Sequence, residues 1–402
     1  MANCKVCNTK IHKFFSLGKM PLVNAFLKKE DLLNEKKFDL SVGFCQNCYL
    51  VQLMKTVNPK DLFSNYLYFS SVTRSIVDHS RKTSKYFIKK FRLNSESLVL
   101  EIGSNDGVHL QFYKEKNINV LGIDPAKNIA KVANGKGIKT IPEFFSLTLA
   151  KKIFSQGVKA DLVYGANVFA HVPEIVDFVK GVKTILNNSG TAIFEFPYVK
   201  GLLDNKFDTI YHEHIFYYSL IALKNLLDSV GLEVYDVEHL EMQGGSLRIY
   251  ISKKSEFPVT ERVKNLEREE FRQGFDKLST YNKINENVNK LKKELLVYLD
   301  KLKNEGKSIV AYGAPAKGMI LLNFFGIKKY LDFIVDKSSV KQGLYTPGSH
   351  MYIYNPSRIR KGNSDYLLIL PWNIATEIAK EYNWYRELGG KFILPVPRLQ
   401  VL

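Results

Sequence analysis

The sequence predicts an α/β protein in which a small N-terminal metal-binding domain precedes two domains built from sheets and helices. Three observations lead to this prediction: all four cysteines lie within the first 48 residues, apolar strand-like runs alternate with helix-length segments from residue 98, and a second strand–turn–helix pattern begins after residue 306. Strands that alternate with helices favour parallel sheets, which bind ligands at the carboxyl ends of their strands. We place the three domains at residues 1–75, 76–255 and 256–402.

The composition is that of a globular protein with a basic surface. The chain has 402 residues, of which 45% are hydrophobic and 12% aromatic, enough for a sizeable core. The sequence shows no signal segment and no apolar run that could span a bilayer, so we expect a cytoplasmic protein without a membrane partner. The net charge of +18 suits phosphate-bearing ligands, or reflects a solvated lysine-rich surface. No basic cluster resembles a nucleic-acid-binding arm, so we expect no nucleic-acid partner.

The cysteines form two C-x2-C pairs, Cys4 with Cys7 and Cys45 with Cys48. A two-residue spacer lets both thiolates of a turn reach one tetrahedral ion, and two such turns complete a Cys4 zinc site. Disulfides or a redox pair are weaker interpretations in a cytoplasmic protein. Four protein ligands leave no open coordination position, so we predict a structural zinc ion and not a catalytic one.

The central region predicts a parallel sheet that ends in an antiparallel hairpin. LVLEIGSNDG, from Leu98, is a buried strand entering a glycine-containing turn, and NVLGIDPA, from Asn119, is a second strand. Further strands are expected within IKTIP, ADLVYGAN and GTAIFEFP. The last two strands, LEVYDVEHL and GGSLRIYIS, are separated by so few residues that they must run antiparallel. This layout is that of S-adenosylmethionine-dependent methyltransferases.

The strand ends carry residues that suit this cofactor. Glu101 and Gly103 end the first strand, where a backbone without a side chain can approach the methionine moiety, and Asp124 ends the second, where a carboxylate can accept both ribose hydroxyls. The turn GSNDG lacks G-x-G-x-x-G and places an aspartate where a pyrophosphate would be repelled, which disfavours NAD. An ordinary structural turn is the alternative. We expect Asn105 and Asp106 to begin the following helix, and the predicted cofactor residues are Glu101, Gly103, Asn105, Asp106, Asp124 and Asn167.

Residues 207–219, FDTIYHEHIFYYS, combine five aromatic rings with His212, Glu213 and His214. A metal centre on the two histidines lacks an obvious third ligand nearby. From the residues alone, a hydrogen-bonded core histidine is a stronger interpretation than a catalytic one.

The C-terminal third predicts a long helix and a second α/β unit. Apolar residues from Ile284 to Leu302 recur every three or four positions, the pattern of an amphipathic helix across the domain junction, with a dimer seam as the alternative. KSIVAYGAPAKG then predicts a strand, a glycine turn and a helix. Amides near Gly313 and the side chain of Lys317 could receive a phosphate, or the fold could be purely structural.

Read in order, several motifs resemble one family along essentially the whole chain. They are FSLGKMPLVNAF, FSNYLYFSS, EIGSNDG, GANVFAHVPE, YHEHIFYYS, GGSLR, YGAPAKGMILLNFFGI, KQGLYTPGSH and LPWN. The chain resembles the sugar C-methyltransferases that act on nucleotide-linked keto-deoxysugars. The resemblance implies a zinc domain, a central Rossmann-like class I methyltransferase domain and a C-terminal Rossmann-like domain that anchors the nucleotide-sugar, with the active site between the last two.

The resemblance also implies site residues. It makes His214 the base, with Tyr211 and Glu213 beside it and Tyr66 or Tyr68 as a further tyrosine; His212 occupies a variable position and competes for the base role. It assigns the C-terminal domain to the nucleotide diphosphate, for which Lys317, Lys341, Gln342 and Thr346 are the candidate residues. His171 follows the fourth strand, where cofactor and substrate would meet, and a structural hydrogen bond is an equal alternative to a role at the site.

The implied reaction is proton removal next to a sugar ketone, followed by methyl transfer to the enolate carbon. Such a reaction needs a base near the α-carbon and hydrogen-bond donors near the oxygen. The partner is then a nucleotide-diphosphate sugar, and we expect a monomer or weak dimer. Sugar O-methylation and a zinc-ribbon RNA methyltransferase are the alternatives.

Overall fold

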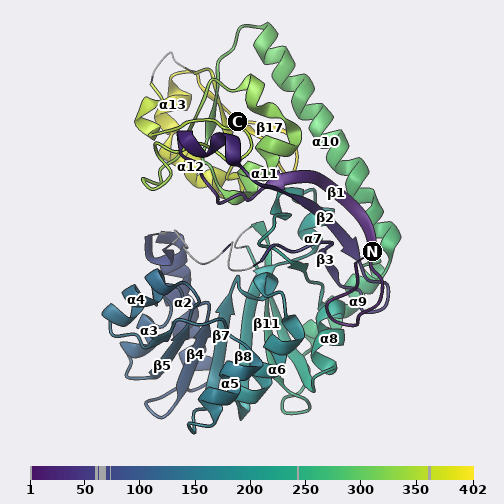
Figure 1. Ribbon diagram of the computed structural model, residues 1–402, viewed down its shortest axis with the longest axis vertical. Coiled ribbons are helices and arrows are strands. Elements are labelled where there is room, and N and C mark those ends of the chain that lie inside the picture. The colour runs from purple at the N-terminus through teal and green to yellow at the C-terminus, as the bar shows by residue number, and fades with distance from the viewer. Residues whose placement is uncertain (1, 59–61, 63–68, 73, 242–243, 361–363) are drawn as a thin grey trace.

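The computed structural model describes residues 2–58, 62, 69–72, 74–241, 244–360 and 364–402. The predicted site residues Tyr66 and Tyr68 lie outside the described residues. Figure 1 shows the central sheet at the bottom, the C-terminal sheet at the top, and the N-terminal strands beside the gap between them. Among the described residues, no helix has the length and apolar character needed to cross a bilayer.

The N-terminal strands form a four-stranded antiparallel sheet in the order β1-β2-β3-β9. The cysteine pairs lie at one end of this sheet, one before β1 and the other in the turn between β2 and β3. The fourth strand comes from the segment FDTIYHEHIFYYS, far along the chain, so that segment is anchored to the cysteine-containing region. The strands are β1 (His12–Pro21), β2 (Lys37–Phe44), β3 (Val51–Leu53) and β9 (Phe216–Tyr217).

The central sheet has seven strands in the order β10-β11-β8-β7-β4-β5-β6. β11 runs antiparallel to both of its neighbours, β10 and β8, whereas the remaining strand pairs of the sheet are parallel. The predicted antiparallel hairpin of β10 and β11 is therefore confirmed. The strands are β4 (Leu98–Ile102), β5 (Asn119–Ile123), β6 (Thr140–Ile141), β7 (Ala160–Ala166), β8 (Leu186–Pro197), β10 (Leu232–Leu240) and β11 (Ser246–Lys253).

Helices cover both faces of this sheet, which is why its strands are apolar runs without alternation. Phe87 of α2 packs on one face with Val99 and Leu162, while Phe178 of α6 packs on the other with Leu100. The helices are α2 (Arg74–Lys90), α3 (Gln111–Lys114), α4 (Lys127–Gly135), α5 (Leu147–Phe154), α6 (Ile175–Ile185), α7 (Lys200–Leu203) and α8 (Leu220–Asp228).

One local prediction in this region is wrong. Asn105 and Asp106 do not begin a helix, because α3 begins only at Gln111. Asn105 has a φ of +49°, and Gly103 and Gly107 also have positive φ, so the chain crosses the strand end in successive turns. Asparagine and glycine tolerate positive φ better than other residues. The turn after β4 is therefore longer than we expected, and it delays the start of α3.

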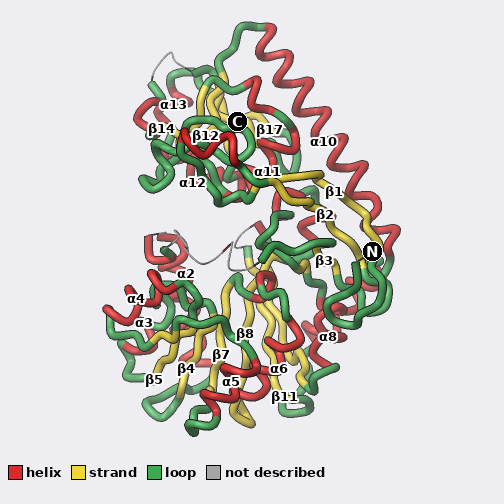
Figure 2. The backbone as a smooth tube through the Cα atoms, in the orientation of Figure 1, coloured by secondary structure: helices red, strands yellow, loops and turns green. Residues whose placement is uncertain are grey.

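The C-terminal region confirms the predicted long helix and second α/β unit. Tyr281 of α10 stacks on Phe44 of β2 at a ring separation of 4.8 Å, so α10 packs along the N-terminal sheet, as Figure 2 also shows. The strand order β14-β13-β12-β15-β16-β17 reverses between β12 and β15, where doubly wound sheets bind ligands. The helices are α9 (Glu261–Arg272), α10 (Leu278–Asn304), α11 (Ala316–Phe325), α12 (Ala375–Glu381) and α13 (Asn383–Glu387), and the strands are β12 (Ile309–Tyr312), β13 (Phe333–Val335), β14 (Ile353–Tyr354), β15 (Tyr366–Ile369), β16 (Lys391–Leu394) and β17 (Gln400–Val401).

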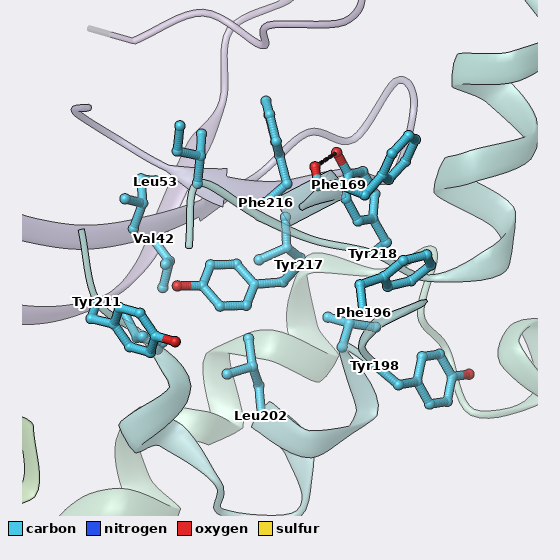
Figure 3. Packing of buried hydrophobic residues seen from close by; sticks show 14 of the residues in the cluster. Val42, Leu53, Phe169, Phe196, Tyr198, Leu202, Tyr211, Phe216, Tyr217 and Tyr218 are labelled. Atoms are coloured by element: carbon cyan, nitrogen blue, oxygen red, sulfur yellow. Dashed lines mark hydrogen bonds between the residues drawn. The ribbon is translucent and has the colours of Figure 1, made fainter. Parts of the chain in front are cut away.

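A single hydrophobic core runs through the three regions. In Figure 3, Val42 and Leu53 of the N-terminal sheet lie near Tyr217, and Phe216 and Tyr218 continue toward Phe196 of β8. The Tyr218 hydroxyl donates to the Phe169 carbonyl at 3.2 Å. This packing holds the segment FDTIYHEHIFYYS rigidly between the N-terminal and central sheets.

Candidate active site and zinc centre

The four cysteine sulfurs converge on one point. Cys4 Sγ lies 3.4 Å from Cys48 Sγ, and Cys7 Sγ lies 3.4 Å from Cys45 Sγ. All four lie within 4.8 Å of one another, and none forms a disulfide. Zinc–sulfur bonds of about 2.3 Å in a tetrahedron separate the sulfurs by about 3.8 Å, so the donor set and spacing fit zinc. Among the described residues, this is the one group of at least three such donors gathered closely enough to hold a metal ion.

A cavity of about 1160 Å³ opens between the carboxyl ends of the central and C-terminal sheets. Its lining includes Gly103 after β4, Lys317 at the start of α11, and Asn24 from the N-terminal region. A pocket for one drug-sized ligand measures roughly 300–1,000 Å³, so this cavity has room for two ligands side by side. The three regions therefore meet at one site.

The central-sheet side of the cavity suits a ligand with an ammonium group and a ribose. Glu101 is 5% exposed, and its Oε2 has no hydrogen-bond partner among the described residues. Burial and the neighbouring Asp124 raise the pKa of Glu101 well above its ordinary value, so a ligand cation would supply a missing partner. Asp124 Oδ2 and Oδ1 accept from the amides of Asn105 and Ala126, both at 2.9 Å, which fixes the carboxylate toward the cavity.

Backbone shape on this side leaves space for the ligand. Gly103 has a φ of +69°, and a Cβ there would approach Val168 to 3.3 Å, so a side chain would be strained and would crowd the cavity wall. Asn105 and Asn167 also line the cavity. The residues present therefore fit S-adenosylmethionine.

Asp106 does not belong with them. Its carboxylate receives Lys136 Nζ at 2.9 Å, it is 1% exposed, and it is absent from the cavity wall. The positive φ of Asn105 turns the chain so that Asp106 points into the protein. Its predicted contact with the cofactor is not supported by this geometry.

His214 lies on the cavity wall with both ring nitrogens engaged. Nδ1 is 2.9 Å from the Thr209 carbonyl oxygen, which can only accept, so Nδ1 carries the proton. Nε2 is then unprotonated and accepts the Tyr211 hydroxyl at 2.6 Å. Burial, together with His171 and Lys317, lowers the pKa of His214 well below its ordinary value. The imidazole is therefore neutral, with its lone pair directed at a phenol.

The neighbouring histidine His212 faces the other way. It is 1% exposed, its Nε2 lies 3.4 Å from the Phe38 carbonyl oxygen of β2, and it does not line the cavity. Of the two histidines that the sequence left in competition, His214 is thus the one that lines the cavity.

Two further predicted residues lie close to His214. The His171 ring, in the turn after β7, meets the His214 ring edge-on with centroids 4.9 Å apart. Glu213 is 5% exposed and lines the cavity, and burial raises its pKa to about 7. His171 and Glu213 thus both lie on the wall of the cavity with His214.

The C-terminal side contributes two basic residues and not the whole predicted set. Lys317 and Lys341 line the cavity, but Gln342 and Thr346 do not. Thr346 is fully buried, and its hydroxyl bonds Ser349 and the Met351 amide, so it stabilises its own turn. Gln342 donates to the Asp336 carbonyl at 2.9 Å.

The amides expected to hold a phosphate are occupied. Gly313 N donates to the Val335 carbonyl at 2.7 Å, and Ala314 N donates to Asp336 Oδ2 at 2.6 Å. Lys341 Nζ donates to the Ala314 carbonyl at 2.9 Å. Lys317 and Lys341 are therefore the residues of this side that suit a phosphate, and because burial lowers the pKa of Lys317, an anion there would favour its charged form.

Sequence reasoning missed a charged group on the cavity wall. Glu195, at the end of β8, receives Arg248 Nε and pairs with His79 Nε2, each at 2.8 Å. Burial opposes ionisation, but His79 and Arg248 together lower the pKa of Glu195 to about 2. An acidic residue at a strand end in GTAIFEFP was the available signal; His79, on α2, gave none.

Comparison with known proteins places the chain in a family. It is 35% identical over 404 aligned residues to the C-methyltransferase NovU of Streptomyces niveus, covering 99% of this chain and 96% of that protein. Three family models match in series: a zinc-binding domain at residues 4–63, a methyltransferase domain at 78–237, and a C-methyltransferase C-terminal domain at 241–397. The chain belongs to the C-methyltransferase family.

Other similarities to this C-methyltransferase are more limited. A tRNA U34 carboxymethyltransferase of Campylobacter jejuni is 25% identical over 36% of this chain and 52% of its own length. The magnesium protoporphyrin IX methyltransferase of Synechocystis, solved with S-adenosylmethionine, has a TM-score of 0.34 at 13% identity, covering 44% of this chain and 79% of its own. A methyltransferase from Clostridium acetobutylicum has a TM-score of 0.36 at 13% identity, with 44% and 92% covered. Because these TM-scores are low, they carry no argument about the fold. The methyltransferase fold is assigned from the strand order of the central sheet.

The cofactor of the C-methyltransferase is S-adenosylmethionine, and the cysteine cluster binds zinc. Glu101, Gly103 and Asp124 line the cavity with a geometry that fits S-adenosylmethionine.

Proposed function

We propose that this C-methyltransferase adds a methyl group to the carbon beside the ketone of a nucleotide-linked keto-deoxysugar. The observation that carries the proposal is the neutral, oriented imidazole of His214, whose Nε2 accepts the Tyr211 hydroxyl at 2.6 Å inside the shared cavity. In the proposal, residues 1–75 bind zinc, residues 76–255 bind the cofactor, and residues 256–402 hold the nucleotide part of the substrate.

The chemistry begins with the base. His214 Nε2 takes the proton from the α-carbon, the C–H bond breaks, and its electron pair moves through the new C=C bond onto the carbonyl oxygen. Before this transfer the Tyr211 hydroxyl turns from Nε2 to the ketone oxygen, which frees the Nε2 lone pair and lets the hydroxyl donate to the developing enolate oxygen. The proton held on Nδ1 by the Thr209 carbonyl keeps Nε2 as the reactive nitrogen throughout.

The lowered pKa of His214 has a consequence for catalysis. A buried neutral imidazole is available as a base at all pH values near neutrality, although it is a weak base. An anionic enolate formed beside it would stabilise the imidazolium, so the proton transfer and the new charge support one another.

Glu213 and the two lysines bind the substrate in this scheme. The Glu213 carboxylate accepts a sugar hydroxyl, and because its pKa is raised to about 7 by burial, turnover should rise with pH through about 7. Lys317 and Lys341 face the diphosphate. When bound by Glu101, Gly103 and Asp124, S-adenosylmethionine would supply the electrophilic methyl group.

Mass spectrometry of products from a panel of nucleotide-linked 4-keto-deoxysugars tests the proposal. We expect a gain of one methyl group on one member, together with loss of deuterium from the position next to the ketone when that position is labelled. Methylation on oxygen without deuterium loss, or methylation of a short RNA in place of the sugars, would overturn it.

A further inference from the structure

Glu213 has a partner from the opposite end of the sequence. Asn24 Nδ2 donates to Glu213 Oε1 at 2.6 Å across 189 positions of the chain. Both residues line the cavity, and the carboxylate is 5% exposed, so water cannot easily replace the amide. The contact is therefore a buried, charge-assisted hydrogen bond within the site.

Asn24 is fixed from both sides of its own segment. It follows β1, which is paired with β2 in the zinc-binding region. Three residues further on, Leu27 and Tyr345 exchange backbone hydrogen bonds of 3.0 and 2.8 Å, which ties the segment to the C-terminal loop.

A second attachment lies beyond the first. Glu35 accepts from the Gly348 amide at 2.7 Å and pairs with His350 Nε2 at 3.0 Å. Residues 22–35 thus run as a strap from the zinc-binding sheet to the loop 345–350, with the Asn24 amide at the cavity wall between the end of β1 and the first attachment at Leu27.

We propose that Asn24 is a positioning residue that orients the Glu213 carboxylate, so that the N-terminal strap and the C-terminal loop together complete the substrate face of the active site. This inference rests on the proposed function, because it assigns Asn24 a part in the role given there to Glu213. Cys4, Cys7, Cys45 and Cys48 then stabilise a region that reaches the proposed substrate-binding carboxylate of Glu213 through one side chain.

The electrostatics agree with this geometry. Burial raises the pKa of Glu213 and the Asn24 amide lowers it, because the amide hydrogen bond favours the carboxylate form. Other titratable groups on the cavity wall include Tyr211 and His214 on the same segment, His171 after β7, Lys317 on α11, and Lys341 on the C-terminal loop.

The test replaces Asn24 by leucine, which has a similar shape but no donor. The Glu213 carboxyl is followed by ¹³C NMR titration of glutamate-labelled protein, and its resonance is identified by its absence in Glu213→Gln. We expect the Glu213 midpoint to rise by about one pH unit in Asn24→Leu, the size of effect that one such hydrogen bond has. Asn24→Gln, which keeps an amide, should give a smaller rise.

Turnover is measured on the same variants. The ascending limb of the kcat profile should shift with the NMR midpoint, so that kcat below the midpoint falls about tenfold. Zinc content and affinity for S-adenosylhomocysteine should match wild type, and the melting temperature should fall by only a few degrees, because one buried hydrogen bond is lost. Asn265→Leu, on the exposed face of α9, is the matched control and should change neither midpoint nor profile.

The two measurements separate the possible failures. An unchanged NMR midpoint in Asn24→Leu would overturn the positioning role, whatever the enzyme methylates. A shifted midpoint with an unshifted turnover profile would keep the Asn24–Glu213 coupling and remove Glu213 from the proposed mechanism.

Discussion

The imidazole of His214 has one tautomer that its neighbours support. Its Nδ1 faces a carbonyl oxygen and its Nε2 faces a hydroxyl, so the pattern of donors and acceptors fixes which nitrogen can take a proton. His212, two residues earlier, has no such arrangement, and its Nδ1 has no partner among the described residues. Two identical side chains therefore differ in chemistry because of what surrounds them.

Replacing His214 by asparagine should reduce kcat by about 10²–10⁴-fold, the usual contribution of a general base. Affinity for S-adenosylhomocysteine, measured by isothermal titration, should stay within a few-fold of wild type, because the cofactor residues lie on other strands. His212→Asn is the matched control and should retain turnover. Retained turnover in His214→Asn with loss in His212→Asn would reverse the assignment.

Replacing Asp124 by alanine should weaken cofactor binding by about 10–100-fold, which corresponds to the loss of roughly 1.5–3 kcal/mol of hydrogen bonding to a charged group. Part of the loss comes from the amides of Asn105 and Ala126, which lose their acceptor. Asp161→Asn is the control, because Asp161 lies near the amino end of β7, away from the carboxyl ends that line the cavity, and accepts from the Leu98 amide. Unaltered affinity in Asp124→Ala would contradict the placement of the ribose.

The start of α8 shows how one helix can satisfy the unpaired amides of another. Glu270 of α9 is fully buried and accepts from the amides of Leu220 and Ile221, at 2.7 and 2.9 Å, and from the Tyr198 hydroxyl. Ser219 adds an ordinary N-cap bond to the Ala222 amide. The first amides of α8, the helix that follows the segment carrying His214, are thus capped by a side chain of α9.

Glu270→Gln should destabilise the protein by about 1–3 kcal/mol, because the new NH₂ group faces an amide that needs an acceptor. Glu267→Gln, one turn earlier in a partly exposed ion pair with Lys224, should cost at most about 1 kcal/mol. Urea unfolding measures both. Equal, small effects would show that the capping contacts are weak.

The same residue predicts a pH dependence. Burial raises the folded-state pKa of Glu270 to about 7, above the ordinary 4.5, so the folded state holds its proton more tightly. This contribution to stability is present below pH 4.5 and is lost as the pH rises through 7. The stability of wild type relative to Glu270→Gln should therefore be greater at acidic pH than at alkaline pH; the opposite trend would contradict the raised pKa.

The three regions of the molecule are joined by shared elements and not by simple linkers. β9 completes the N-terminal sheet although it lies within the central part of the chain, and α10 packs along that sheet while leading into the C-terminal region. One hydrophobic cluster extends through all three. The cavity, whose wall takes residues from all three regions, therefore forms only when the three regions pack together.

Replacing Cys45 by serine should abolish stoichiometric zinc, measured by atomic absorption, and lower the melting temperature, because metal binding and folding of such a site are coupled. Since β9 joins the segment that carries His214 to this region, and Asn24 of the strap lines the cavity, turnover should fall sharply while cofactor affinity changes little. Ser41→Ala, on β2 of the same sheet, is the control. Full turnover without zinc would show that the metal region does not support the site.

Several features were predictable because they depend on local periodicity and spacing. The two C-x2-C pairs, the antiparallel terminal hairpin and the apolar stripe of α10 follow from short spacers and from recurrences every three or four residues. The turn after β4 was predicted less well, since two positive-φ glycines and Asn105 lengthen it and direct Asp106 inward.

The sequence alone determined the element types, their order, the metal ligands and the family resemblance, because each is encoded by neighbouring residues or by motifs in series. Only the tertiary structure decided that His214 faces the cavity and His212 does not, that Asn24 reaches Glu213, and that Glu195 is paired with His79 and Arg248. The segment 207–219 is mostly irregular, with no helical or strand period to assign its faces. The direction of each side chain there is set by what packs against it from distant parts of the chain, and such contacts leave no local pattern.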